Sequence, residues 1–138
     1  MTRSRHVRHA LIAAAIAASA CRAPTPEAAR ELQRERSGTL DVVLLSERDA
    51  LRQGTDTFVI EFRSAANGAL IDAGDVRGSA TMPMGGTPMF GMVDIVPTDV
   101  PGRYSATGNL SMAGTWRLTV EGEGPAGKGT VTFPASVQ

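Results

Sequence analysis

The chain has 138 residues, with 14 basic and 14 acidic side chains, a single cysteine and two histidines. This length fits one domain of about 100 residues with extensions, and a domain of that size buries a core without needing disulfides. Because the residues after position 21 carry no basic patch or stripe, nucleic acid is excluded as a partner on electrostatic grounds.

The first 21 residues have the pattern of an export signal. Residues 1–9 include the basic Arg3, Arg5 and Arg8, and residues 10–20 are apolar or small throughout. A basic start, a short apolar run and small residues before the cleavage point are typical of a secretory signal peptide. The apolar run is about half as long as a membrane-spanning helix, so we expect an exported protein and not a transmembrane segment.

Cys21 is the only cysteine and stands at the end of this signal. The segment Ala18-Ser19-Ala20-Cys21 resembles a bacterial lipobox, in which the cysteine is lipidated and becomes the mature N-terminus, although Ala18 stands where leucine is usual. The same small residues also suit ordinary signal peptidase, which releases a soluble protein. We expect a lipoprotein anchored to the membrane on the periplasmic side of a bacterial envelope, with a soluble periplasmic protein as the alternative.

Residues 22–38 are predicted to be a polar linker. Pro24 and Pro26 interrupt regular structure, and the segment Glu27–Arg36 is rich in Ala, Glu and Arg. A short exposed helix is compatible with that composition, but Leu32 is its only large hydrophobic residue. A helix without an apolar stripe has no face to pack against a core, so the segment is interpreted as a spacer.

From Thr39 onward the sequence alternates between strand-like runs and turn residues, which predicts an all-β domain over residues 39–138. A possible short edge strand covers 69–71, and seven further strands are expected at residues 40–45, 57–62, 76–82, 91–96, 102–110, 115–121 and 129–133. About seven short strands in roughly 100 residues indicate an immunoglobulin-like antiparallel β-sandwich, with a barrel as the alternative. Trp116 is expected to anchor the core and Tyr104 to be buried at a turn-to-strand corner.

The residue types that are missing argue against catalysis. His6 and His9, the only histidines, belong to the signal, so the mature chain has no imidazole for acid–base chemistry or metal binding. A single cysteine cannot build a structural zinc site. Lys128 is the only lysine and no glycine-rich loop precedes a helix, which excludes a phosphate-binding loop. We therefore expect a protein that is not an enzyme.

Methionine is concentrated in one segment. Four of the five methionines after Met1 lie in Met82–Met92, a stretch interrupted by prolines and glycines, and the fifth is Met112. Thioether sulfur is a soft, neutral ligand that suits Cu(I) better than Zn²⁺ or Mg²⁺. Met82 and Met84 are two residues apart and project to the same side of an extended chain, and the Gly-Gly-Thr-Pro turn can fold Met89 back toward them. The candidate metal ligands are Met82, Met84, Met89, Met92 and Met112.

Packing is the competing interpretation of these methionines, because Met fills irregular core gaps and lines hydrophobic surfaces. On that interpretation Met92 continues an alternating strand and belongs to the core, and Met112 packs under Trp116. Phe90 then makes the loop an apolar docking patch. The irregular loop is expected at the surface, where exposed methionines need an explanation.

Three segments together resemble the YtkA-like domain family. They are Met82-Pro83-Met84-Gly85, then Val100-Pro101-Gly102-Arg103-Tyr104, then Met112-Ala113-Gly114-Thr115-Trp116 with its continuation to Val120. The resemblance runs from about Thr39 to Phe133. It implies an extracytoplasmic immunoglobulin-like sandwich, with Met82, Met84 and Met112 on the family's methionine positions. It also implies kinship with domains of heavy-metal efflux systems and with FixH proteins of copper-oxidase assembly.

These observations lead to two functional hypotheses. The first is a non-catalytic exported lipoprotein domain that binds Cu(I), or another soft metal, through its Met-rich loop and passes it to an efflux or oxidase-assembly membrane protein. The second is a metal-free accessory module that docks on a membrane-protein partner through the same loop. No cofactor other than Cu(I) is expected.

Overall fold

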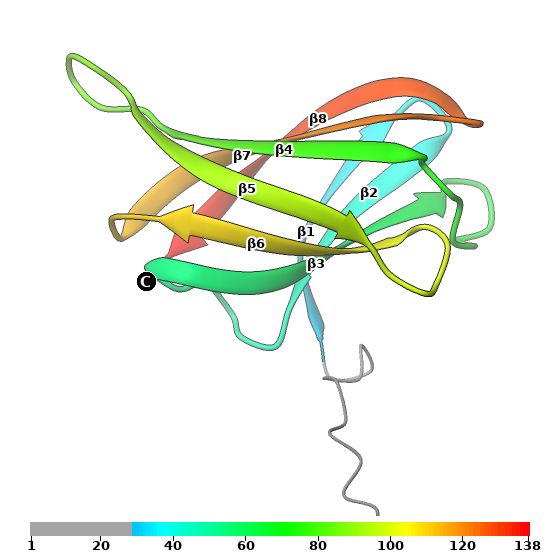
Figure 1. The fold of residues 1–138 in the computed structure, drawn as a ribbon, viewed down its shortest axis with the longest axis horizontal. Helices are drawn as coiled ribbons and strands as arrows, with labels where there is room; N and C mark the ends of the chain where they lie inside the picture. The colour runs from blue at the N-terminus through cyan, green and yellow to red at the C-terminus, as the bar shows by residue number, and fades with distance from the viewer. Residues whose placement is uncertain (1–28) are drawn as a thin grey trace, which may run out of the picture.

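The computed structural model describes residues 29–138, and all of their regular structure is β (Figure 1). The predicted signal peptide, the lipidation position Cys21 and residues 22–28 of the predicted linker lie outside the described residues. No helix in the described part of the chain is long and apolar enough to cross a membrane. The eight strands are β1 (Arg30–Ser37), β2 (Leu40–Ser46), β3 (Gly54–Ser64), β4 (Asp75–Met82), β5 (Met89–Pro97), β6 (Arg103–Leu110), β7 (Gly114–Gly124) and β8 (Gly127–Val137).

The strands pair antiparallel in the order β1-β2-β3-β6-β5-β4-β7-β8. Strands β1 and β8, at the two ends of this order, contact each other, so the sheet curls into a nearly closed sandwich around one core (Figure 1). The predicted all-β, immunoglobulin-like antiparallel sandwich is confirmed. It has eight strands where about seven were expected, and the seven main predicted strands overlap β2–β8.

The additional strand is β1, and it corrects the predicted linker. Residues 30–37 were assigned to a spacer over 22–38, but they form a hairpin with β2, with Arg34 opposite Val43. The prediction failed because Leu32 is the only large hydrophobic residue of this charged segment, so its sequence shows neither a helical nor a strand-like apolar pattern. Leu32 packs against the core, while Arg34 and Arg36 are exposed and pair with Asp41. The domain therefore begins near Arg30 and not at Thr39.

A smaller correction concerns residues 69–71. They were predicted as a possible edge strand, but they make only an isolated bridge, between Arg63 and Leu70. The Asn67-Gly68 turn directly before them is present, and the Asn67 side chain accepts a hydrogen bond from the Ala69 backbone N–H at 3.0 Å. The segment is part of the connection from β3 to β4.

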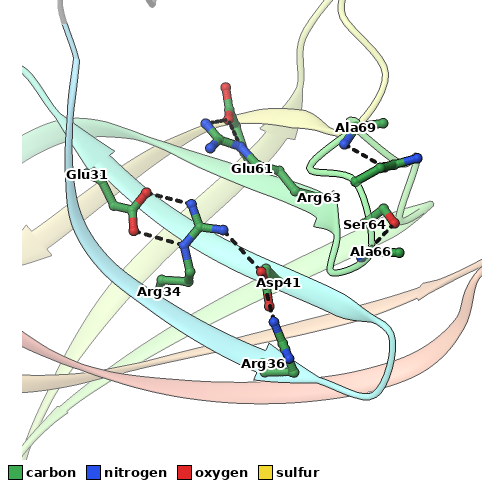
Figure 2. A network of polar contacts seen from close by, with 10 residues as sticks. Glu31, Arg34, Arg36, Asp41, Glu61, Arg63, Ser64, Ala66 and Ala69 are labelled. Carbon is green, nitrogen blue, oxygen red and sulfur yellow. Dashed lines mark hydrogen bonds and ion pairs between the residues drawn. The ribbon is translucent and has the colours of Figure 1, made fainter.

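An ion-pair network on the outer face holds β1 to β2 (Figure 2). Arg34 lies between Glu31 and Asp41, and its Nη1 donates to Asp41 Oδ2 at 3.1 Å. Arg36 Nε donates to Asp41 Oδ1 from the other side at 2.9 Å. The hydrogen bond from Arg36, followed by that from Arg34, lowers the pKa of the Asp41 carboxyl from its ordinary value. Asp41 itself is buried, so it is accommodated only because two guanidinium groups compensate its charge.

A second buried acid repeats this arrangement on β3. The Glu61 carboxylate is 3% exposed and pairs with Arg63 on the same strand and with Arg103 on β6, whose Nε donates to Oε1 at 2.8 Å. Glu61 lies opposite Val43 of β2, which in turn lies opposite Arg34 of β1. The two sets of ion pairs therefore lie on the same face of four adjacent strands, β1, β2, β3 and β6.

The core contains the aromatic side chains that were predicted to be buried. Trp116 is fully buried and packs with Phe58, Phe133 and the aliphatic residues of β2, β3, β7 and β8, which confirms its role as an anchor. Tyr104 is also buried, as predicted. Its hydroxyl accepts from the Ala73 N–H at 3.2 Å and donates to the Gly74 carbonyl at 3.0 Å, so it fastens the connection from β3 to β4. Burial raises the pKa of this hydroxyl.

Candidate metal-binding site

Of the described methionines, all but Met92 lie near the end of the sandwich where β4 turns into β5. Met82 is the last residue of β4 and Met89 is the first of β5. The two residues are direct partners in the antiparallel register. Side chains at such positions lie on the same face, with Cβ atoms about 4.5–5.5 Å apart. The predicted folding of Met89 back toward Met82 is confirmed.

The residue types of the connecting loop favour this reversal of the chain. Residues 83–88 are exposed, and they contain two prolines and two glycines. Gly86 has a φ of 115°, a value that residues with a Cβ rarely adopt. The loop projects from the end of the β4–β5 hairpin (Figure 1), and it carries Met84 at its base with 46% of that side chain exposed.

Met82 and Met89 face the interior of the sandwich. Both are partly buried and pack against the core cluster. They share a face with Ala80 and Val93, which are buried farther along the same strands. Two adjacent thioethers thus close the apolar core at this end of the molecule.

Met112 approaches from the turn between β6 and β7. The Met82 side chain reaches the first residue of β7, Gly114, where an added Cβ would overlap the Met82 Cε and lie 3.8 Å from its sulfur. Gly114 also has a φ of 137°, so both its backbone and its surroundings call for glycine. Trp116 Nε1 donates to the Met112 carbonyl at 2.9 Å, which fixes the turn beside the buried indole. The Met112 side chain is 40% exposed, and the contact with Trp116 that the structure describes is made by the Met112 carbonyl.

Met92 lies apart from the other methionines. The register from Met82–Met89 to Gly78–Val93 is continuous, so a residue three positions after Met89 faces the opposite side of the sheet. Met92 is 71% exposed on the outer face, and its predicted place in the core is wrong. The alternation of β5 was predicted correctly, but Val93 and not Met92 occupies the inner face.

The outer face of β5 carries an apolar stripe. Phe90, Met92 and Val96 all project from it and are 75%, 71% and 55% exposed. Asp94 lies between the last two, with Arg77 of β4 on the neighbouring strand. Phe90 was predicted from the sequence as a docking residue, but Val96 was not placed beside it. The even spacing of residues 90, 92 and 96, which puts them on one face of a strand, was the signal in the sequence that could have predicted this stripe.

The chemistry open to the inner methionines is that of neutral soft ligands. Two to four thioethers bind Cu(I) without releasing a proton, and they offer little to hard divalent cations. Within residues 29–138 there is no group of three or more His, Cys, Asp or Glu side chains placed to hold a metal ion. A metal at this end of the described domain would therefore be held by sulfur.

Comparisons with known proteins place the chain in a family. No curated protein matches it. A similar solved structure is described as the crystal structure of the Lin-41 filamin domain; it is 17% identical, has a TM-score of 0.49, and the match covers 70% of this chain and 91% of the other. The family model described as YtkA-like matches residues 34–121. Since that is more than half of the chain, the protein belongs to the YtkA-like family, as its motifs predicted.

Proposed function

We propose that this YtkA-like domain is a non-catalytic, exported metal-handling domain that binds Cu(I) through the thioethers of Met82 and Met89. The observation that carries the proposal is the direct pairing of these two methionines on the inner face, with Met82 reaching Gly114 beside Met112. Met112 and the exposed Met84 are the additional ligands within the same end of the domain. A two- or three-sulfur site of this kind suits an oxidising compartment, where a free thiolate would be oxidised.

Exposure of part of the set supports a role in transfer rather than in permanent storage. Met84 and Met112 remain open to solvent while Met82 and Met89 are partly buried. A partner that offers its own sulfur ligands can therefore reach the metal from the loop side. The partner class we propose is a membrane protein of copper efflux or oxidase assembly, and Met84 is the residue that would release the ion first.

The test is a Cu(I) titration of residues 22–138, which contain all eight strands, against a competing chromogenic chelator without oxygen. Met82→Leu and Met89→Leu should each weaken binding by about tenfold or more, roughly 1.4 kcal/mol, because leucine keeps the volume and removes the sulfur. Met92→Leu is the matched control, since the same change on the outer face should leave affinity unaltered. Equal affinity in all variants, or no competition at micromolar protein, would exclude this site.

Export and anchoring are proposed from the residues before the described part. We propose that the protein is a lipoprotein on the periplasmic side of the membrane, attached through Cys21. Labelled fatty acid should enter the wild-type chain and not the Cys21→Ser variant. Unlabelled wild type, released from cells with the soluble periplasmic fraction, would favour the soluble alternative.

A second candidate function rests on the outer stripe. Exposed apolar side chains in a row often mark a surface that binds a protein, and Phe90, Met92 and Val96 form such a row. On this hypothesis the domain is a metal-free accessory module. A photo-crosslinking residue at Phe90 should capture a membrane protein in the host, and one at the exposed Thr132 of β8 should not. A docking surface should also tolerate Met82→Leu and Met89→Leu.

A further inference from the structure

Two neighbouring loops at one end of the sandwich are apolar and carry no charge. They are the β4–β5 loop, residues 83–88, and the β6–β7 turn, residues 111–113, and both lie at the left of the view in Figure 1. Met84 and Met112 lie in these loops and are 46% and 40% exposed, and Phe90, just after the first loop, is 75% exposed. We call the two loops and Phe90 the methionine end. It holds three of the five exposed large hydrophobic side chains in the described part of the chain.

The chain enters the domain at this same end. Strand β1 is antiparallel to β2, so its first residue, Arg30, lies beside the end of β2. Arg30 forms an ion pair with Asp49 in the connection from β2 to β3. Gln53, in the same connection, donates from its side-chain amide to the Ser111 carbonyl at 2.9 Å. The β2–β3 connection therefore joins the start of β1 to the β6–β7 turn, where Met112 is exposed.

The length of chain before β1 keeps this end close to the proposed lipid anchor. From Cys21 to Arg30 the chain can span at most about 30 Å, since an extended residue covers at most about 3.3–3.6 Å. A tether this short gives the domain an effective concentration of mM order at the bilayer. Because the chain enters at the methionine end, this end reaches the bilayer without the tether having to pass along the domain.

The charges beside the methionine end favour neither attraction to the membrane nor repulsion from it. The β2–β3 connection carries two acids and two bases, Glu47, Arg48, Asp49 and Arg52, and therefore no net charge. Basic clusters are what draws a protein surface to anionic lipids, and this end has none. Any attraction to a bilayer must therefore come from the apolar side chains, and it should change little with salt.

We propose that the methionine end docks on the lipid bilayer in which Cys21 is anchored. Met84, Met112 and Phe90 lie among the lipid headgroups, where binding strength increases with the apolar area that is buried. The loops enter no deeper, because their backbone N–H and C=O groups need partners that the hydrocarbon core does not offer. The inference rests on the proposed lipid anchor and is independent of copper.

The test uses residues 21–138, which contain all eight strands, coupled to vesicles through Cys21. Because Cys21 is the only cysteine, a maleimide lipid attaches the chain there, whether or not the cell lipidates it. The vesicles are phosphatidylethanolamine and phosphatidylglycerol with brominated acyl chains, which quench a tryptophan that contacts them. Met84→Trp is the probe, and Ala126→Trp, in the exposed β7–β8 turn, is the matched control at the opposite end. The buried Trp116 of wild type gives the background.

The fluorescence of Met84→Trp should be quenched several-fold more than that of Ala126→Trp, at low and at high salt. Quenching of the two probes to the same extent would overturn the orientation. No quenching above the wild-type background would overturn the bilayer as the occupant and would leave this end to a protein partner. Neither copper nor another protein is present, so a failed Cu(I) titration does not affect the result. Labelling with fatty acid tests the anchor separately.

A second set of variants separates docking from mere proximity to the vesicle. The probe is moved to Met112→Trp, in the neighbouring turn, and the β4–β5 loop is changed at Met84. Met84→Asp adds a charge to an exposed loop, so it should keep the fold and reduce the quenching to the level of Ala126→Trp. Met84→Leu is the matched control and should leave the quenching unchanged. Quenching that survives Met84→Asp would overturn the role of the loop.

Discussion

The outer faces of two regions of the sheet differ in whether their side chains have partners within the domain. On β1–β2–β3, the buried Asp41 and Glu61 are each paired with two arginines, in part from neighbouring strands. On β5, Phe90 and Met92 project into solvent with no covering element among the described residues. A buried carboxylate without a partner would be costly, so the first face is complete within the domain. The second face retains apolar surface that another molecule can cover.

The largest expected effect on stability comes from removing the Glu61 carboxylate from the β1–β2–β3 face. Glu61→Gln leaves Arg63 and Arg103, both about a quarter exposed, without their shared carboxylate. We expect the free energy of unfolding to fall by about 3 kcal/mol, at the low end for a buried pair that loses one partner. Urea unfolding measures it, with the exposed Glu121→Gln as control. A loss as small as that of the control would mean that solvent compensates the two arginines.

A smaller effect is expected from acidification, through Asp41. The pKa of this carboxyl is lowered in the folded state, so its contribution to stability is present above the ordinary value of 3.8 and is lost as the pH falls through the folded value. The pKa of the Glu31 carboxyl is also lowered, mainly by its hydrogen bond with Arg34, so Glu31 contributes to the pH dependence in the same direction. Urea unfolding at pH 7 and pH 3 should show a smaller difference in Asp41→Asn than in wild type. An identical pH dependence in the two proteins would contradict the folded-state pairing of Asp41.

The smallest effect is expected on the β5 face. Phe90→Ser and Met92→Ser should each change the free energy of unfolding by less than about 0.5 kcal/mol, because exposed side chains contribute little to the core. Val93→Ser, on the inner face of the same strand, is the control and should cost about 1–3 kcal/mol. A large loss at Met92 would mean that the stripe is covered within the molecule. Thermal and urea unfolding both measure the difference.

The sequence predicted the strands better than the ends of the domain. Alternation of polar and apolar residues located β2–β8, and Trp116 and Tyr104 were assigned correctly to the interior. Strand β1 was missed because charged residues such as Arg34 and Arg36 are typical of a linker. They are stable in a sheet here only because Asp41 lies across from them. That partner comes from a register that the local sequence does not display.

The candidate site was predicted in part for the same reason. The Gly-Gly-Thr-Pro loop indicated that Met89 would return toward Met82, since turn chemistry is local. Met82 of β4 approaches Gly114 of β7. These two strands pair directly although they are far apart in the sequence, so the local pattern of residues could not predict the contact. The cleft between the β1–β2 and β7–β8 turns was not predicted, because it arises from two end strands, β1 and β8, that contact each other without pairing.

The amino-acid sequence by itself therefore determined the all-β class, the main strands, the anchoring aromatic residues and the methionine-rich hairpin. All of these depend on residue type and on spacings of a few positions. The tertiary structure decided which side of each strand is inside. A period of two defines two faces but does not say which one meets the core, and for β5 that choice sent Val93 inward and Met92 outward. It was made by pairing with β4 and β6, which in turn pair with β7 and β3, two strands that lie farther away along the chain.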